Sequence, residues 1–174
     1  MFVITGIMAS GKSTVAQLLA ERLDQAVHVR GDTFRKMVVT GRKEFLPNPS
    51  SEAMRQLRIR YQLTASVADT YFEAGFHVVV QDVIIGPMLE EFISLIKSRP
   101  LFLVVLTPNE QKIAEREMAR QKTGYGLWSI SELNNTLQTD TPKIGMWLDT
   151  TELTPDETVE EILKRAAIEG LLQI

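Results

Sequence analysis

Short runs of apolar residues alternate along this chain with longer segments whose apolar positions recur at helical spacing. The apolar runs predict five strands, at residues 2–5, 26–30, 76–81, 101–107 and 145–149. Three of these are continuous apolar runs, as expected where helices cover both faces of a sheet. The alternation of strands with helices predicts an α/β fold with a largely parallel sheet.

Helical periodicity and capping residues place the intervening helices. One helix follows the first strand, a long helix covers about residues 50–74, and another begins at Pro87. The last helix is predicted to open with Thr154 as its N-cap, a proline at the first helical position and a capping-box glutamate two residues later. A weaker capping box at Ser129 predicts a short helix before the fifth strand.

Composition limits the class of protein. The chain has 174 residues, 44% of them hydrophobic and 24% charged, which predicts one globular domain over residues 1–174. A net charge of -3 gives no bulk attraction to polyanions, so neither nucleic acid nor a membrane is expected as a partner. The chain has no cysteine, no targeting segment and no membrane-spanning apolar run. We therefore expect a cytoplasmic protein, either a monomer or a homodimer.

A glycine-rich segment after the first strand carries the strongest chemical signal. Residues 6–13 match G-x-x-x-x-G-K-S, between an apolar strand and an amphipathic helix. The glycines let successive N–H groups face a bound anion, and the following helix adds its positive end. We therefore predict that this loop binds a nucleoside triphosphate, with Lys12 along the β- and γ-phosphates and the Ser13 hydroxyl on Mg²⁺. The expected contacts are Gly6, Met8, Ala9, Ser10, Gly11, Lys12, Ser13 and Thr14.

Two other classes of phosphate-loop protein are excluded. The guanine-binding N-K-x-D and the D-x-x-G switch of GTPases do not occur in the sequence. A mechanical AAA-type ATPase carries a larger body and a helical lid domain, for which 174 residues leave no room. A small phosphotransferase remains.

Acidic residues follow the second and third predicted strands. Asp32 lies just past the carboxyl end of the second strand, where ligands bind in open α/β sheets. Its carboxylate can accept the proton of a substrate hydroxyl, with Arg35 holding an anionic or polar substrate group. Asp82 ends the third strand in a pattern close to Walker B, interrupted by Gln81, and would reach Mg²⁺ through water or orient the substrate. The plainer alternatives are that Asp32 caps a helix and Asp82 caps a loop.

Arginines on two predicted helices are further candidates. Arg116 and Arg120 are four residues apart, on one face of the helix after the fourth strand and next to a segment with two glycines. Two guanidiniums there suit closure over the nucleotide and the transferring phosphoryl group, so we expect a small mobile lid at about residues 116–128. The alternative is a solvated helix with ordinary ion pairs. Arg55 and Arg58 share a helix face, which either contacts the substrate or is simply solvated.

Together these features resemble the small P-loop kinases grouped with chloramphenicol phosphotransferase and, more distantly, gluconate and shikimate kinases. The resemblance covers nearly the whole chain. It rests on the phosphate loop, Asp32, Asp82, the Arg116/Arg120 pair and the L-D-T-T segment at residues 148–151. It implies a three-layer P-loop fold whose five-stranded parallel sheet has the order 2-3-1-4-5, is flanked by helices and carries a mobile lid.

The resemblance also implies ATP and Mg²⁺ as co-substrates and in-line transfer of the γ-phosphoryl group to a hydroxyl of a small molecule. By position, Lys12 stabilises the phosphates, Asp32 is the base and Arg120 is the lid arginine, while Thr151 lines the adenine pocket by analogy. The chain departs from some relatives in having a single acid after the second strand, and Gln81 where a second acid stands before Asp82.

The phosphoryl acceptor is expected to bind in residues 33–71, which mix basic and aromatic side chains. The basic residues favour an anionic acceptor such as a sugar acid or metabolite, and the aromatic residues favour a hydrophobic one such as an antibiotic. The sequence leaves both open. It also leaves open two other hypotheses, a nucleoside or nucleotide kinase and a nucleotide-binding regulatory protein with vestigial catalysis.

Overall fold

The computed structural model describes residues 1–119 and 125–173. Within these residues five strands form one sheet, in which every neighbouring pair is parallel. The spatial order is β2-β3-β1-β4-β5, which confirms the sheet and the order implied by the resemblance. The strands are β1 (Phe2–Thr5), β2 (Ala26–Arg30), β3 (His77–Gln81), β4 (Phe102–Leu106) and β5 (Met146–Leu148).

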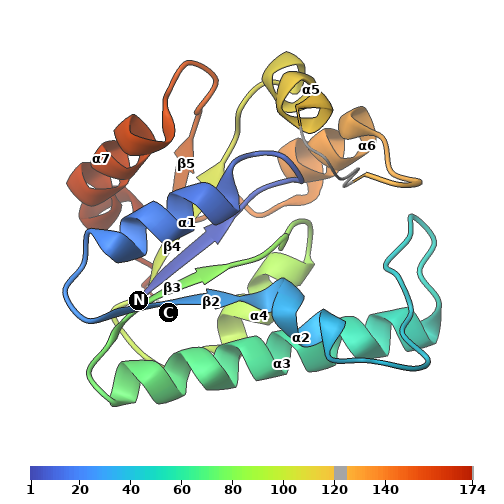
Figure 1. Ribbon diagram of the computed structural model, residues 1–174, viewed down its shortest axis with the longest axis horizontal. Coiled ribbons are helices and arrows are strands. Elements are labelled where there is room, and N and C mark those ends of the chain that lie inside the picture. Colours follow the sequence, from blue (N-terminus) through green and yellow to red (C-terminus); the bar gives the residue numbers. More distant parts are fainter. Residues whose placement is uncertain (120–124, 174) are drawn as a thin grey trace.

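Helices cover both faces of the sheet and complete a three-layer α/β fold (Figure 1). Helices α1 (Lys12–Glu21) and α7 (Pro155–Arg165) pack on one face, and α3 (Ser51–Glu73) and α4 (Met88–Leu95) pack on the other. Successive residues of a strand point to opposite faces, so each face has its own apolar core.

The remaining helical segments are short. They are α2 (Gly31–Lys36), α5 (Glu110–Met118), α6 (Ile130–Asn135) and the π-helical turns η1 (Thr136–Asp140) and η2 (Ala166–Gly170). The capping boxes predicted at Ser129 and Thr154 are both formed, at the starts of α6 and α7. Sequence patterns do not predict α2, η1 or η2, because each is too short to show helical periodicity.

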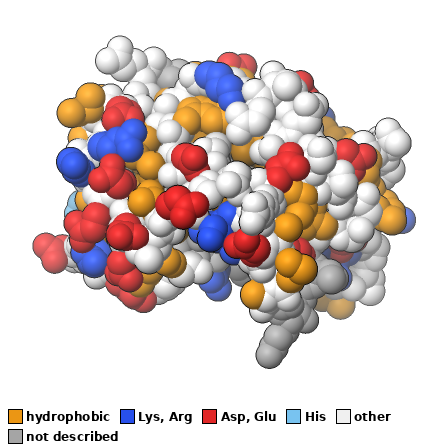
Figure 2. All heavy atoms as spheres, turned by 90° about the horizontal axis from the view of Figure 1, so that it is seen from above, with side chains coloured by type: hydrophobic (Ala, Val, Ile, Leu, Met, Phe, Trp, Pro, Cys, Tyr) orange, Lys and Arg blue, Asp and Glu red, His pale blue; other side chains and the backbone are white. Residues whose placement is uncertain are grey.

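The parallel arrangement brings the loops after all of the strands to one edge of the sheet. Figure 2 shows acidic and basic side chains interspersed over the upper face of the molecule, so that face carries no broad field of one sign. In the part of the chain that the structure describes, no helix combines the length and apolar character needed to cross a bilayer.

A buried carboxylate fastens α3 to the segment between α4 and β4. Asp69 is 8% exposed. Its oxygens accept hydrogen bonds from the backbone N–H groups of Lys97, at 3.1 Å, and Ser98, at 2.9 Å. These contacts satisfy backbone groups that would otherwise be buried without partners.

We predict that Asp69→Ala lowers the free energy of unfolding by roughly 1.5–3 kcal/mol, because it leaves buried N–H donors without an acceptor. Asp69→Asn keeps one acceptor oxygen and is expected to cost less. Guanidinium unfolding measures both effects. Thr70→Ala is the control, since the Thr70 hydroxyl only donates back to the carbonyl oxygen of Ser66. Equal stability of Asp69→Ala and Thr70→Ala would contradict the assignment.

Candidate phosphoryl-transfer site

The loop between β1 and α1 is shaped to hold an anion. Positive φ angles of 143° at Gly6, 61° at Ala9 and 98° at Gly11 curl its backbone. Gly6 is required there, since a Cβ atom would lie 2.6 Å from the carbonyl oxygen of Leu106. Helix α1 begins directly after Gly11, so its N-terminal N–H groups and positive dipole end adjoin the loop.

The lysine and serine of the loop are both held in place. Lys12 is 5% exposed, and its Nζ donates to the carbonyl oxygen of Ile7 at 2.6 Å. The Ser13 hydroxyl donates to Oε1 of Gln81, at the end of β3, over 3.1 Å. In the sequence, Gln81 interrupts the Walker B pattern. The structure instead brings it to the side chain predicted to bind Mg²⁺.

The donor set here fits a hydrated Mg²⁺ ion. Mg²⁺ prefers oxygen ligands and keeps several waters when it is bound together with phosphates, so it needs no cage of carboxylates. Ser13 and Gln81 supply hydroxyl and amide oxygens next to the loop. The part of the chain that the structure describes contains no cluster of three or more His, Cys, Asp or Glu side chains suited to holding a metal.

Arg116, in α5, connects the loop to the segment after β5. Its Nη1 donates to the carbonyl oxygen of Ser10 and its Nη2 to that of Thr150, each at 3.2 Å. Burial lowers the pKa of this guanidinium from its usual value. Both of these hydrogen bonds are to neutral carbonyl groups, so the guanidinium is suited to contact a phosphate beside the loop.

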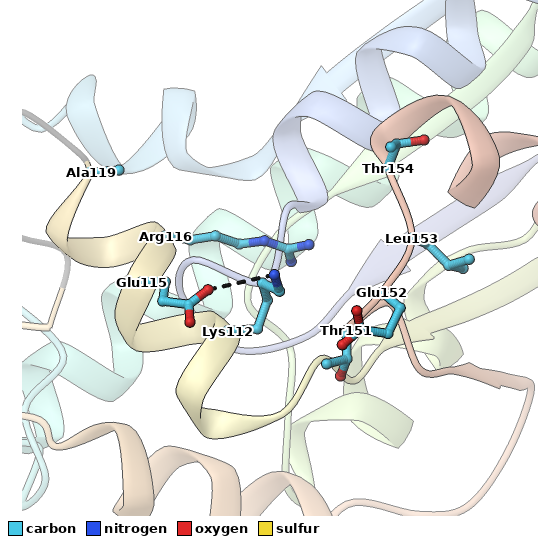
Figure 3. Close-up of a pocket in the computed structure, with 8 residues that line it drawn as sticks. All are labelled: Lys112, Glu115, Arg116, Ala119, Thr151, Glu152, Leu153 and Thr154. Carbon is cyan, nitrogen blue, oxygen red and sulfur yellow. Dashed lines mark ion pairs between the residues drawn. The ribbon is translucent and has the colours of Figure 1, made fainter.

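A cavity of about 410 Å³ lies beside Arg116. In Figure 3 side chains of α5 and the residue after it lie opposite those of the segment between β5 and α7. Thr151 lines the cavity, but its hydroxyl donates to Asp149 at 2.6 Å and accepts from the N–H of Asn109 at 2.9 Å. The full lining is Lys112, Glu115, Arg116, Ala119, Thr151, Glu152, Leu153 and Thr154.

Asp32 lies in the first turn of α2 and is held by two cations. Its Oδ1 accepts from Nε of Arg35 at 2.8 Å, and its Oδ2 pairs with Nζ of Lys36 at 2.7 Å. Partial burial acts to raise the pKa of Asp32, but the hydrogen bonds and charges of Lys36 and Arg35 outweigh it and lower the pKa to about 2. The alternative that Asp32 caps a helix is wrong, because the N-cap of α2 is Arg30.

Asp82 forms a buried ion pair that sequence analysis did not anticipate. Its oxygens accept from Nε of Arg60 at 2.7 Å and from Nη2 of the same side chain. The side chains of Arg60 and Asp82 are 14% and 2% exposed. A Cβ atom on Gly31 would collide with the Asp82 carboxylate, so α2 approaches this pair only with glycine at its first position. The carboxylate predicted to reach Mg²⁺ is therefore directed to α3.

A sequence signal for Arg60 exists. It lies on α3 three residues after Leu57 and four before the fully buried Thr64, so it occupies the apolar stripe of the helix. A charge at such a position requires a buried partner. Arg58, two residues earlier, lies on a different side of the helix and pairs with Glu91 of α4 at 2.8 Å. Arg58 thus forms an exposed ion pair with a neighbouring helix.

Parts of the predicted lid contact the site. Tyr125 donates to the carbonyl oxygen of Met8 in the loop at 2.6 Å. Trp128 donates to the carbonyl oxygen of Phe45 at 3.0 Å, and the two rings stack with centroids 6.4 Å apart. Sequence analysis missed both contacts, since each joins segments far apart in the chain. Arg120, the predicted lid arginine, lies outside the described residues.

Comparison with known proteins agrees with this geometry. A protein-family model described as an AAA domain matches residues 1–134, and the chain belongs to this family of P-loop proteins. A UPF0200 protein of Aeropyrum pernix is 31% identical over 136 residues, which are 76% of this chain and 71% of that protein.

Solved structures of kinases share the fold. A sugar kinase from Janibacter superposes with a TM-score of 0.72 at 17% identity, over 96% of this chain and 94% of that one. The APS kinase of Mycobacterium tuberculosis in complex with AMPPNP and APS has a TM-score of 0.67 at 20% identity, over 94% and 95% of the two chains. The resemblance to small P-loop kinases is thereby confirmed at the level of the fold.

We predict that Arg60→Met lowers the free energy of unfolding by about 3–5 kcal/mol, because it leaves a buried carboxylate unpaired. Adding Asp82→Asn to this variant removes that charge and is expected to restore part of the loss. Arg55→Met is the control on the same helix, since Arg55 pairs with Glu52 at the surface. The assignment fails if chemical denaturation finds Arg60→Met as stable as Arg55→Met.

Proposed function

We propose that the protein transfers the γ-phosphoryl group of ATP, with Mg²⁺, to a hydroxyl group of a small molecule. The main support for the proposal is that the phosphate loop and Asp32 lie at the same edge of the sheet. The phosphate loop with Lys12 and Ser13 follows β1, and the carboxylate of Asp32 follows β2. In the sheet β3 lies between β1 and β2, which supports a phosphate site and a proton-accepting carboxylate on either side of its end.

The nucleotide occupies the loop and the cavity beside α5. The triphosphate lies against the loop N–H groups and Lys12, and the base enters the cavity of about 410 Å³ that Thr151 helps to line. This volume falls within the roughly 300–1,000 Å³ of ordinary ligand sites. Arg116 touches both regions through Ser10 and Thr150, so it is suited to contact the phosphates from the side of the base.

Ser13 is the proposed protein ligand of Mg²⁺, and Gln81 orients its hydroxyl. The ion would offset the negative charge of the phosphate oxygens and help to orient them. Both carboxylate oxygens of Asp82 contact Arg60. Asp82 therefore affects the proposed Mg²⁺ region indirectly, by its negative charge and by holding Arg60 in place.

The carboxylate of Asp32 accepts a hydrogen bond from the hydroxyl group of the phosphoryl acceptor. The hydroxyl oxygen attacks the γ-phosphorus, the bond to the bridging oxygen breaks, and that oxygen leaves as part of ADP. The hydroxyl proton passes to Asp32 and then to solvent. With a pKa of about 2, Asp32 is ionised in neutral solution, where it is a weak base. It therefore contributes mainly by orienting the hydroxyl and takes the proton late in the transfer.

The test uses MgATP and a desalted mixture of metabolites and antibiotics, analysed by mass spectrometry for species that gain one phosphoryl group. We expect such a product with the wild type and none with Lys12→Ala. Lys164→Ala, which removes an exposed lysine paired with Glu161, is the control and should behave as the wild type. Products confined to nucleosides or nucleotides would select that class of kinase. ATP binding with no product from any class of acceptor would favour a nucleotide-binding regulatory protein.

We predict that Asp32→Asn lowers the rate of phosphoryl transfer by about 10²–10⁴, because the neutral amide orients the hydroxyl less strongly and cannot take its proton. Steady-state kinetics measures the loss, with the exposed Asp24→Asn as a control expected to match the wild type. Because the pKa of Asp32 is lowered to about 2, it stays ionised through the neutral and mildly acidic range. If kcat/KM of the wild type falls as the pH is lowered from 8 to 5, a group other than Asp32 causes the fall. The residual kcat/KM of Asp32→Asn must then fall over the same pH range. Equal rates for Asp32→Asn and the wild type would remove Asp32 from the mechanism.

A further inference from the structure

Basic side chains outnumber acidic ones in α2 and the loop that follows it. Between residues 31 and 46 the chain has four basic and two acidic residues, in a protein whose net charge is -3. The basic residues are Arg35, Lys36, Arg42 and Lys43, and the acidic residues are Asp32 and Glu44. This local excess of positive charge raises the concentration of anions at this part of the surface.

Three of these cations share two carboxylates. Asp32 pairs with Arg35 at 2.8 Å and with Lys36 at 2.7 Å. Glu44 pairs with Arg35 at 2.6 Å and with Arg42 at 3.2 Å. Each carboxylate therefore serves two cations, so these side chains keep N–H donors for a further oxyanion.

Lys43 adds a cation beside a groove between α2 and α3. It forms no ion pair in the part of the chain that the structure describes. Its charge acts on Glu52, which itself pairs with Arg55 at 2.8 Å. Lys43 and Arg35 both line the groove, whose other walls are mainly apolar. An anionic ligand with an apolar part can therefore contact cations and apolar side chains together.

The carboxylate of Glu44 makes the contacts that a bound oxyanion would make. Nη1 of Arg35 donates to its two oxygens at 2.7 and 2.6 Å, and Nε of Arg42 lies 3.2 Å from Oε1. Guanidinium groups bind carboxylates and phosphates through charge-assisted hydrogen bonds of this kind. Glu44 thus marks the position of an oxyanion between two arginines.

Glu44 can leave this position by rotating its side chain alone. It lies in the connection between α2 and α3, which contains no helix or strand, and its side chain is 54% exposed. The backbone on either side is held, since the N–H of Lys43 donates to Gln56 at 2.9 Å and the carbonyl oxygen of Phe45 accepts from Trp128 at 3.0 Å. Exposed ion pairs contribute little to stability, so a ligand anion can replace this one at small cost.

Arg35 connects this position to the carboxylate of Asp32. Its Nε donates to Asp32 at 2.8 Å, while its Nη1 donates to Glu44. An oxyanion in place of Glu44 would be bound by the same guanidinium that holds Asp32. A molecule bound in this way needs only a short connection between its oxyanion and the hydroxyl group that Asp32 accepts.

We infer that the phosphoryl acceptor carries an oxyanion, a carboxylate or a phosphate group, which replaces Glu44 between Arg35 and Arg42. The inference rests on the proposed function and specifies its substrate class. Glu44 is then an internal competitor of the acceptor, because its carboxylate occupies the position that the acceptor's charged group takes. Removing the charge of Glu44 should therefore strengthen binding of the acceptor.

The experiment follows three probes by residue-resolved NMR titration of the full chain, with and without saturating Mg²⁺ and AMPPNP. The probes are phenyl phosphate, benzoate and benzyl alcohol, which share a phenyl ring and differ in charge. We expect saturable shifts at residues 35–44 with at least one of the two anions, and at least about tenfold weaker binding of the alcohol. The tighter of the two anions identifies the charged group of the acceptor as phosphate or carboxylate.

Two glutamates provide a matched pair of variants. Glu44→Gln is expected to strengthen binding of the tighter anion about two- to fivefold, since it removes an exposed ion pair that competes with the ligand. Glu169→Gln makes the same change in net charge, at an exposed glutamate that pairs with Arg165 at 2.8 Å, and should leave binding unchanged. Arg35→Gln is expected to weaken binding about tenfold, with Arg165→Gln as its control. The NMR spectra verify directly that each variant is folded.

The inference is overturned if neither anion shows saturable binding, if both anions shift only the phosphate loop at residues 6–13, or if the alcohol binds as tightly as both anions. Equal binding by Glu44→Gln and Glu169→Gln would overturn it as well. So would products formed only from uncharged acceptors in the mass-spectrometric assay.

The proposed function fails by different results, namely the absence of AMPPNP binding or of any phosphorylated product. The titration of nucleotide-free protein reports on residues 35–44 whatever the nucleotide does. The two failures are therefore distinguishable.

Discussion

A charge buried at the carboxyl edge of the sheet requires a buried partner, and this requirement organises the region around Asp82. The partner is Arg60, 22 residues away in the chain. Their pairing fixes α3 against the end of β3, and Gly31 lets the start of α2 approach the same carboxylate. The elements that form the proposed acceptor side of the site, α2 and α3, therefore meet at one ion pair.

The same strand end also organises the nucleotide side. Gln81, the residue before Asp82, contacts the hydroxyl of Ser13 at 3.1 Å. Two consecutive residues at the end of β3 thus face opposite partners: Gln81 contacts the phosphate loop and Asp82 contacts α3. Since β3 lies between β1 and β2, a phosphoryl group passing from the loop after β1 to an acceptor at Asp32 would cross the end of this strand.

Much of the fold was predictable from sequence because its signals are local. Apolar runs locate the strands, and the loop at residues 6–13 carries its own glycines and its flanking elements. The capping boxes at Ser129 and Thr154 are likewise short-range patterns, and both are formed. Strand order is not a local property, and it came from the resemblance to small P-loop kinases.

The electrostatics of the site was harder to predict, because charge pairing depends on contacts between distant residues. Arg58 and Arg60 differ by two positions, yet one forms an exposed pair with Glu91 and the other a buried pair with Asp82. Arg35 pairs with both Asp32 and Glu44, and neither partner is indicated by the sequence pattern. Composition shows an excess of basic residues in this segment, but only the structure shows that Arg35, Lys36 and Arg42 share the carboxylates of Asp32 and Glu44.

Our central proposal is that the carboxyl edge of the sheet binds a nucleoside triphosphate together with Mg²⁺. Isothermal titration of AMPPNP into the protein, with Mg²⁺ and then with EDTA, tests this most directly. The account predicts one saturable site whose affinity falls at least about tenfold when Mg²⁺ is removed, because the ion offsets the charge of the phosphates. Absence of saturable binding, or binding of equal strength with and without Mg²⁺, would contradict it.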